Sequence, residues 1–203
     1  VCKKAEEKFG IHVIPVMSPG FAGHKSVGYR MACNAIMELL ARAPKAPKKI
    51  GSVNILGDFN LAGEMWIIKG YLEEMGIKVV AKITGDANCD ELIHAGEAEL
   101  NIVQCAGSMT YLAKRMEETM GIPYIKVSFF GIEDTSQSLI HIAQALEYKE
   151  AEKKARLLIA RETRALDELL YRSRQTLNGK KAAIYVGGGF KAISLIKQFR
   201  EIG

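Results

Sequence analysis

The sequence predicts an α/β fold, a Rossmann-like parallel sheet flanked by helices. Two observations predict it. First, a glycine separates a helical stretch from an apolar run at three places: "KFGIHVIPV" (8–16), "EMGIKVVAKI" (74–83) and "TMGIPYIKVSF" (119–129). A glycine just past a helix adopts the left-handed conformation that ends it. Second, the runs are apolar without alternation, which is typical of strands covered on both faces.

Strands and helices alternate along the middle of the chain. The predicted strands are "SVNIL" (52–56), "KVVAKI" (78–83), "LNIVQC" (100–105) and "IPYIKVSF" (122–129). Helical stretches with apolar residues three and four positions apart lie between and after them. They are "EMWIIKGYLEEM" (64–75), "SMTYLAKRMEETM" (108–120) and "SQSLIHIAQAL" (136–146). This βαβα order predicts a parallel sheet with helices on both faces.

Two predicted helix starts have the spacing of a capping box. They are Asn88 with Glu91, and Asp134 with Gln137. In such a box the two side chains, three residues apart, bond to the backbone N–H groups of the first turn. We therefore expect helices to begin at Asn88 and Asp134.

The end of the chain predicts a further unit. Residues 149–178 form one long, charged helical stretch, and a strand "AAIYV" (182–186) and a helix "KAISLIKQFRE" (191–201) follow it. Because the chain begins without Met in a helical pattern and ends before another strand, we expect an internal fragment, truncated at both ends. The expected parts are the end of a first α/β domain (1–46), a central parallel-sheet domain (47–148), a connecting helix (149–180) and the start of a third α/β domain (181–203).

Composition narrows the class of protein. Apolar residues make up 48% of the chain and charged residues 25%, as in soluble globular proteins. No apolar run approaches the roughly 18 residues of a membrane helix, so we expect no membrane partner. The net charge of +5 is spread over helix faces without interleaved aromatic residues. This pattern argues against nucleic acid as a partner and is compatible with an anionic small ligand.

The cysteines indicate a reducing compartment. Cys2, Cys33, Cys89 and Cys105 include no CxxC pair, which argues against a disulfide framework and against a zinc knuckle. We therefore expect reduced thiols and a cytoplasmic location. A small buried hydrophobe is the ordinary role of such a cysteine.

Ligands of open parallel sheets bind beyond the carboxyl ends of the strands, where this chain has several Gly-rich loops. "SPGFAGHKSVGYR" (18–30) brings His24, Lys25 and Arg30 to a helix start, as a cradle for an anion or a cluster would. "YVGGGFKA" (185–192) has strand, glycines and helix in order, but it matches neither G-x-G-x-x-G nor a Walker A motif. Ordinary turn chemistry remains the alternative for both loops.

Cys105 differs from the other cysteines in its position. It ends a predicted strand, precedes Gly107 and Ser108, and lies at a predicted helix start, where a thiolate is favoured. Position alone leaves three roles open: metal ligand, nucleophile or buried hydrophobe.

Five segments, in this order, resemble the nitrogenase molybdenum–iron protein α-subunit superfamily. They are "PVMSPGFAGHKSVGYR", "GDFNLAGEMW", "NIVQCAGSMTYLAKRMEETMGIPY", "SFFGIEDTSQSL" and "YVGGG". Within it, "GFAGHKSVG" and "FFGIEDTS" are similar to the cofactor-assembly scaffolds. The catalytic subunits typically have a His-His pair where this chain has Tyr29 and Arg30, so the resemblance argues against substrate reduction.

The resemblance implies a set of site residues. Cys105 would hold one terminal iron of the cofactor or its precursor, and Ser108 would lie close to that thiolate. The cofactor-binding residues that the resemblance implies are Gly23, His24, Lys25, Tyr29, Phe59, Asn60, Ser108, Gly187 and Gly188. A basic residue of the family falls on Phe190, with Lys191 beside it. The family's cysteines for a 4Fe-4S cluster between subunits would lie outside this fragment.

The functional hypothesis is therefore a scaffold that holds an Fe-S precursor of the iron–molybdenum cofactor during maturation. The implied partners are a homologous β-like scaffold subunit, in an α₂β₂ assembly, and the nitrogenase iron protein. One alternative is the α-subunit of a catalytic nitrogenase-like reductase. A second is a nucleotide-binding α/β domain that uses residues 187–189.

Overall fold

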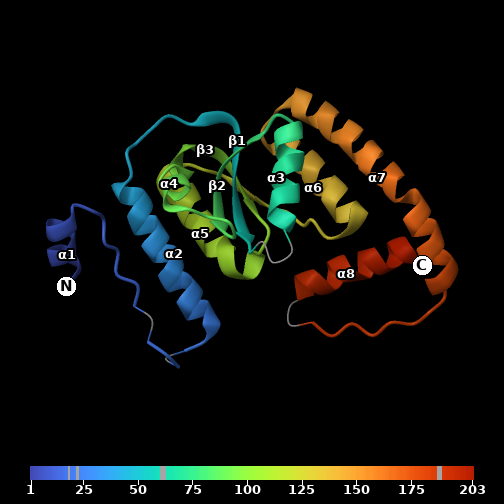
Figure 1. The fold of residues 1–203 in the computed structure, drawn as a ribbon, viewed down its shortest axis with the longest axis horizontal. Helices are drawn as coiled ribbons and strands as arrows, with labels where there is room; N and C mark the ends of the chain where they lie inside the picture. The colour runs from blue at the N-terminus through green and yellow to red at the C-terminus, as the bar shows by residue number, and fades with distance from the viewer. Residues whose placement is uncertain (18, 22, 60–62, 187–188) are drawn as a thin grey trace. The chain divides into compact units, whose positions relative to one another are not determined.

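The computed structural model describes residues 1–203 except 18, 22, 60–62 and 187–188, with no side chain described at 189–191. Figure 1 shows its elements in chain order. The described residues form two compact units. The first comprises residues 1–66 and 78–126, and the second comprises residues 67–77 and 127–203. The finer division into parts of three domains stays a prediction.

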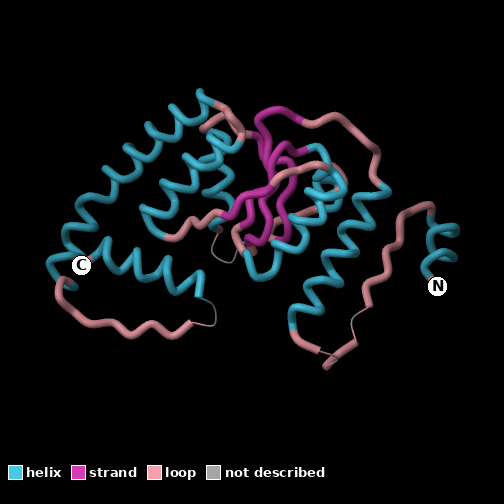
Figure 2. The backbone as a smooth tube through the Cα atoms, turned by 180° about the vertical axis from the view of Figure 1, so that it is seen from behind, coloured by secondary structure: helices cyan, strands magenta, loops and turns pink. Residues whose placement is uncertain are grey.

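The first unit is built on a parallel sheet, which confirms the predicted fold class. Its strands are β1 (Lys49–Asp58), β2 (Lys78–Thr84), β3 (Ala98–Val103) and β4 (Tyr124–Lys126). They lie side by side in the order β2–β1–β3–β4, and every pair is parallel. The strands of the sheet are magenta in Figure 2. The eight residues 51–58 of the central strand β1 are all buried. This burial explains why the apolar runs do not alternate.

The described residues of the first unit also form four helices. They are α1 (Cys2–Phe9), α2 (Lys25–Arg42), α4 (Cys89–Leu92) and α5 (Ala106–Met120), with a 3₁₀ turn at Ala95–Glu97. Helix α5 packs against β1, β3 and β4, and α2 packs along α5. Arg30 and Tyr111 meet near the starts of these two helices, and Ala41 and Thr119 line one hollow near their ends. The two helices therefore run in the same direction.

The second unit is helical. Its elements are the larger part of α3 (Glu64–Glu74), α6 (Gly131–Ala145), α7 (Lys149–Leu177) and α8 (Gly189–Ile202). Helix α6 packs against both α7 and α8. The long helix predicted at residues 149–178 is confirmed as α7. Among the described residues, no helix is long and apolar enough to cross a membrane.

One of the two predicted helix caps is confirmed and the other is wrong. The Asn88 Oδ1 accepts a hydrogen bond from the Glu91 backbone N–H at 2.7 Å, and α4 begins at the next residue. Helix α6 instead begins at Gly131, so Asp134 lies one turn inside it. The Asp134 carboxylate accepts bonds from the Ser194 hydroxyl (2.6 Å) and the Lys197 ammonium (2.7 Å), both on α8. The Asp134 carboxylate therefore links α6 to α8 and does not cap α6.

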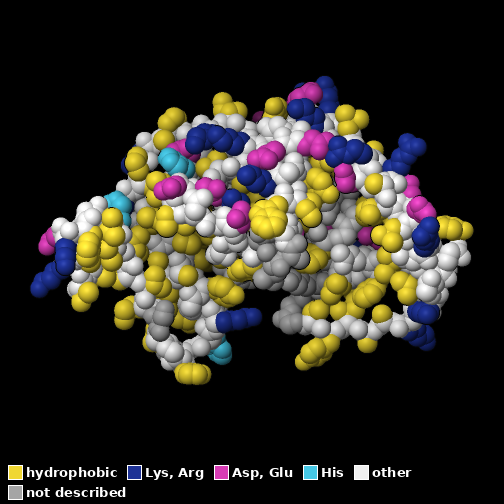
Figure 3. All heavy atoms as spheres, viewed as in Figure 1, with side chains coloured by type: hydrophobic (Ala, Val, Ile, Leu, Met, Phe, Trp, Pro, Cys, Tyr) yellow, Lys and Arg dark blue, Asp and Glu magenta, His cyan; other side chains and the backbone are white. Residues whose placement is uncertain are grey.

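Two predicted strands are absent from the described structure. Residues 11–16 and 182–186 form no ladder, and Ile11 and Tyr185 stand exposed. Hydrophobic side chains are visible over α1 and the stretch after it (yellow in Figure 3). A strand is stable only when a neighbouring strand pairs with its backbone. Within the part of the chain that the structure describes, neither segment has such a neighbour.

Candidate functional site

Cys105 lies at the junction that the sequence predicts. Strand β3 ends at Val103, and Cys105 is the N-cap residue of α5. Its carbonyl accepts hydrogen bonds from the backbone N–H groups of Ser108 (3.2 Å) and Met109 (3.0 Å). The residue is partly exposed. The thiol therefore sits at the carboxyl edge of the sheet, where ligands of such folds bind.

Gly57 positions Cys105. It has a φ of +88°, and a Cβ built on it would lie 2.7 Å from the Cys105 Cβ and 2.9 Å from the Cys105 nitrogen. Beside it, the Gln104 N–H donates to the Leu56 carbonyl at 2.9 Å. Only glycine fits this close approach between β1 and the start of α5. The sequence alone does not single out Gly57, and its place at the end of an apolar run is the one indication.

Ser108 supports the backbone of this junction. The side chain is buried, and its hydroxyl donates to the Cys105 carbonyl at 3.4 Å. This bond satisfies a first-turn group of α5 rather than the thiol. Proximity of Ser108 to a bound thiolate stays a prediction.

The cationic loop lies at the start of α2. His24 is the N-cap residue without a side-chain cap bond, and Gly23, His24 and Lys25 are exposed while Tyr29 is half-buried. Because α2 runs parallel to α5, this end of α2 and the start of α5 point to the same edge of the unit. The hydrogen bonds and ion pairs of the described residues do not link the loop to Cys105.

The structure describes only some of the remaining predicted site residues. Phe59 follows β1 directly and is 41% exposed, so its ring is available at the sheet edge. Asn60, Gly187 and Gly188 lie outside the described residues, and so do the side chains of Phe190 and Lys191. The roles that the resemblance implies for them stay predictions.

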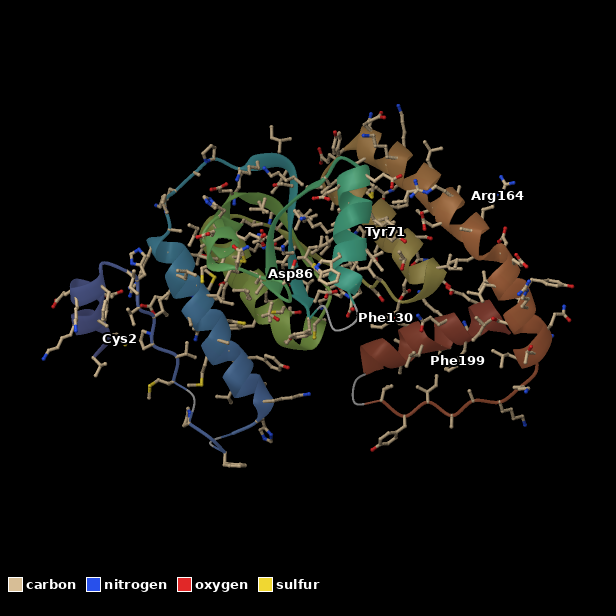
Figure 4. All side chains as sticks on the ribbon, in the orientation of Figure 1. Cys2, Tyr71, Asp86, Phe130, Arg164 and Phe199 are labelled. Atoms are coloured by element: carbon tan, nitrogen blue, oxygen red, sulfur yellow. The ribbon has the colours of Figure 1, made fainter. Side chains whose placement is uncertain are left out.

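The loop after β2 is occupied by its own ion pairs. The Lys82 ammonium, on a side chain only 7% exposed, lies 3.0 Å from the Glu91 carboxylate and 3.2 Å from that of Asp86 (labelled in Figure 4). Burial opposes the charge of Lys82, but the bonds and charges of Glu91 and Asp86 outweigh it and raise its pKa. This loop therefore has a structural role, and Cys89 at the start of α4 is exposed, whereas Cys105 is only partly exposed.

One further side-chain arrangement lies between α2 and α5. The Tyr111 hydroxyl donates to the Asn34 Oδ1 at 2.8 Å, and the Arg30 guanidinium carbon lies 5.7 Å from the Tyr111 ring centroid. Sequence spacing cannot reveal this arrangement, because its residues come from two distant helices. Asn34 and Tyr111, for example, are 77 residues apart.

Cys105 has open surroundings among the described residues. The described residues contain no group of three or more His, Cys, Asp or Glu side chains that could hold a metal ion. Cys105 is partly exposed, and a Cβ built on nearby Gly107 would meet no atom of the other described residues within 4 Å. The described residues therefore leave space at the start of α5, where first-turn N–H groups favour a negatively charged ligand.

The comparisons place the chain in a known class. A family described as "Nitrogenase component 1 type Oxidoreductase" matches residues 1–203, so the chain belongs to this family. The resemblance noted from the sequence is thereby confirmed.

Particular relatives are named for cofactor assembly. The "Nitrogenase iron-molybdenum cofactor biosynthesis protein NifE" of Clostridium pasteurianum is 59% identical over 203 residues, which are 100% of this chain and 44% of the relative. The protein of the same name from Methanosarcina barkeri is 46% identical and is covered to 46%. The chain thus spans less than half the length of these curated relatives.

Solved structures confirm the fold. "Nitrogenase Cp1 at pH 5" matches with a TM-score of 0.92 at 32% identity, over 100% of this chain and 41% of that chain. "Nitrogenase Cp1 at pH 6.5" matches with a TM-score of 0.89 over 98% of this chain and 39% of that one.

Proposed function

We propose that this chain belongs to a scaffold for assembly of the nitrogenase iron–molybdenum cofactor, and that Cys105 holds the iron–sulfur precursor as cargo. The relatives named for this biosynthesis support the role. One observation carries the residue assignment: the partly exposed Cys105 is the N-cap residue of α5 at the carboxyl edge of the sheet, held there by the contact of β1 at Gly57.

The residues of this chain have defined tasks in the proposal. The Cys105 thiolate binds one iron atom, as cysteine thiolates do in iron–sulfur proteins. The first-turn N–H groups of α5 stabilise negative charge beside it. Gly57 fixes the position of the thiol, and the exposed Lys25 adds positive charge near the same edge. In the proposal these groups bind, position and neutralise charge, so the function is to hold the cargo.

The assembly and its setting are part of the proposal. The full-length protein pairs with a homologous β-like subunit in an α₂β₂ complex and receives the nitrogenase iron protein as a partner. The likeness to nitrogenase structures supports such a complex. The four free cysteines support a cytoplasmic setting.

A catalytic reductase subunit is the second candidate, since the same nitrogenase structures share this fold. Tyr29 stands where the resemblance places a functional histidine, which favours holding over reduction. Acetylene reduction by the full-length complex, abolished by Cys105→Ala, would favour the catalytic role.

The proposed function is tested by two matched variants of the full-length complex. Cys105 and Cys89 each lie at a helix start, but only Cys105 packs against β1. We expect Cys105→Ala to lower the precursor iron content to the background of the unloaded complex and to remove its electron paramagnetic resonance signal. We expect Cys89→Ala to retain both. Wild-type iron content and signal in Cys105→Ala would overturn the proposal.

A further inference from the structure

Arg30 is held against an aromatic ring of α5, the helix that begins after Cys105. Its guanidinium lies 5.7 Å from the Tyr111 ring centroid, within the range of a cation–π contact. The Tyr111 hydroxyl is itself held by the Asn34 Oδ1 at 2.8 Å. Two bonded groups, one on each helix, thus orient the guanidinium between α2 and α5.

Gly107 leaves room beside this stack. Residues four apart share one face of a helix, so Gly107 lies on the Tyr111 face, one turn nearer to Cys105. Its φ is not in the left-handed region, and a Cβ built on it would meet no atom of the other residues that the structure describes within 4 Å. Neither the backbone nor packing among the described residues requires a glycine here, although glycine weakens a helix relative to alanine.

Arg30 also has N–H donors that are available to a ligand. Arg42, Arg156 and Arg161 each form ion pairs with glutamates. Within the described part of the chain, no carboxylate pairs with Arg30. A guanidinium carries five N–H donors, and stacking on a ring uses its face rather than these donors.

We propose that Arg30 is a further binding residue for the cargo held at Cys105. Its N–H groups donate to the negatively charged face of the iron–sulfur cargo, across the space that Gly107 leaves open. Tyr111 acts as a positioning residue, because it holds the guanidinium without touching the cargo. This inference rests on the proposed function and adds to it a second point of attachment.

The test compares two arginines in the full-length complex loaded with precursor. Arg115 lies one turn beyond Tyr111 on α5, toward the opposite end of the helix, and serves as the matched control. We expect Arg30→Gln to lose iron to an external chelator about tenfold faster than wild type, because charge-assisted hydrogen bonds are the strong ones. Arg115→Gln should match wild type, and Arg30→Lys should recover part of the retention.

The open space is tested in the same assay. Gly107→Met should fold normally and lose the cargo, because the added side chain occupies the space of the cargo. Gly70 is the control, since it is also helical and a Cβ built on it meets no atom within 4 Å. Gly70→Met should retain the cargo as wild type does. Wild-type retention of the cargo in Gly107→Met would contradict the proposal that Arg30 reaches the cargo across the space beside Gly107.

The outcomes separate the two proposals. If Cys105→Ala loses the cargo while Arg30→Gln retains it like wild type, the inference on Arg30 is overturned and the proposed function stands. If Cys105→Ala also retains the cargo, the proposed function itself fails. Equal iron loss in Arg30→Gln and Arg115→Gln would show a general charge effect and would also overturn the inference.

Discussion

Replacing Gly57 by alanine is expected to lower the free energy of unfolding by about 3 kcal/mol. The new Cβ would lie 2.7 Å from the Cys105 Cβ, 2.9 Å from the Cys105 nitrogen and 3.1 Å from the Met109 Cγ. All three atoms belong to the start of α5, which cannot move away without loss of the packing of α5 on the sheet. The φ of +88° adds backbone strain for any residue with a side chain.

This expectation is measured by urea unfolding of the full-length complex. Gly28→Ala is the control in the same unit, because a Cβ built on this α2 residue meets no atom within 4 Å. It should be neutral or slightly stabilising, since alanine favours a helix. A Gly57→Ala variant as stable as Gly28→Ala would mean that β1 and Cys105 do not touch as described.

The second large effect is expected at Asp134, which ties α8 to α6. Asp134 is 8% exposed and accepts bonds from Ser194 and Lys197. Ser194 in turn lies 3.1 Å from the Ser128 hydroxyl. Asp134→Ala removes the acceptor that these groups share and leaves the buried Ser194 hydroxyl unpaired on that side. We expect a loss of about 2 kcal/mol, because the buried Ser194 hydroxyl and the partly exposed Lys197 ammonium lose a charged acceptor.

The control for Asp134 is its sequence neighbour. Glu133 also lies 3.0 Å from the Lys197 ammonium, but its side chain is 49% exposed. Glu133→Ala should therefore change the urea midpoint little, because exposed ion pairs contribute little. Equal midpoints for Asp134→Ala and Glu133→Ala would contradict a buried network.

The same carboxylate predicts a pH dependence. Burial raises the pKa of Asp134, but the bonds from Lys197 and Ser194 outweigh burial and hold the pKa below its usual range. The stabilisation is therefore present above the unfolded-state pKa and is lost as pH falls through the folded-state value. Stability measured for wild type and Asp134→Asn should differ by a constant amount above about pH 5. This difference in stability should shrink below about pH 4. An unchanged difference there would contradict a stabilising role of the ionised Asp134 carboxylate.

The sequence predicts those elements of the fold that local pattern decides. The run "IKVVAKI" has a glycine before it and enough apolar residues to be buried on both faces, and it forms β2 as expected. The run "AAIYV" has a similar composition and forms no strand in the described structure. The difference is the presence of a pairing partner, which local sequence does not reveal.

The residues of the candidate site also divide into those that local sequence predicts and those that it does not. The place of Cys105 is predictable because a strand end and a helix start adjoin in sequence. The contact of Gly57 with Cys105 and the stack of Arg30 on Tyr111 depend on packing between distant segments. Asp134 has the spacing of a cap, but its partner Ser194 lies 60 residues away, on another helix. Tertiary contacts override the local pattern at these positions.

The central claim is that Cys105 binds the cargo through one iron–sulfur bond. Anomalous diffraction at the iron absorption edge, from crystals of the full-length complex loaded with precursor, tests it most directly. The account predicts an iron peak within bonding distance of the Cys105 Sγ, beside the start of α5. An iron cluster bound in the complex with every iron atom beyond bonding distance of that sulfur would contradict it.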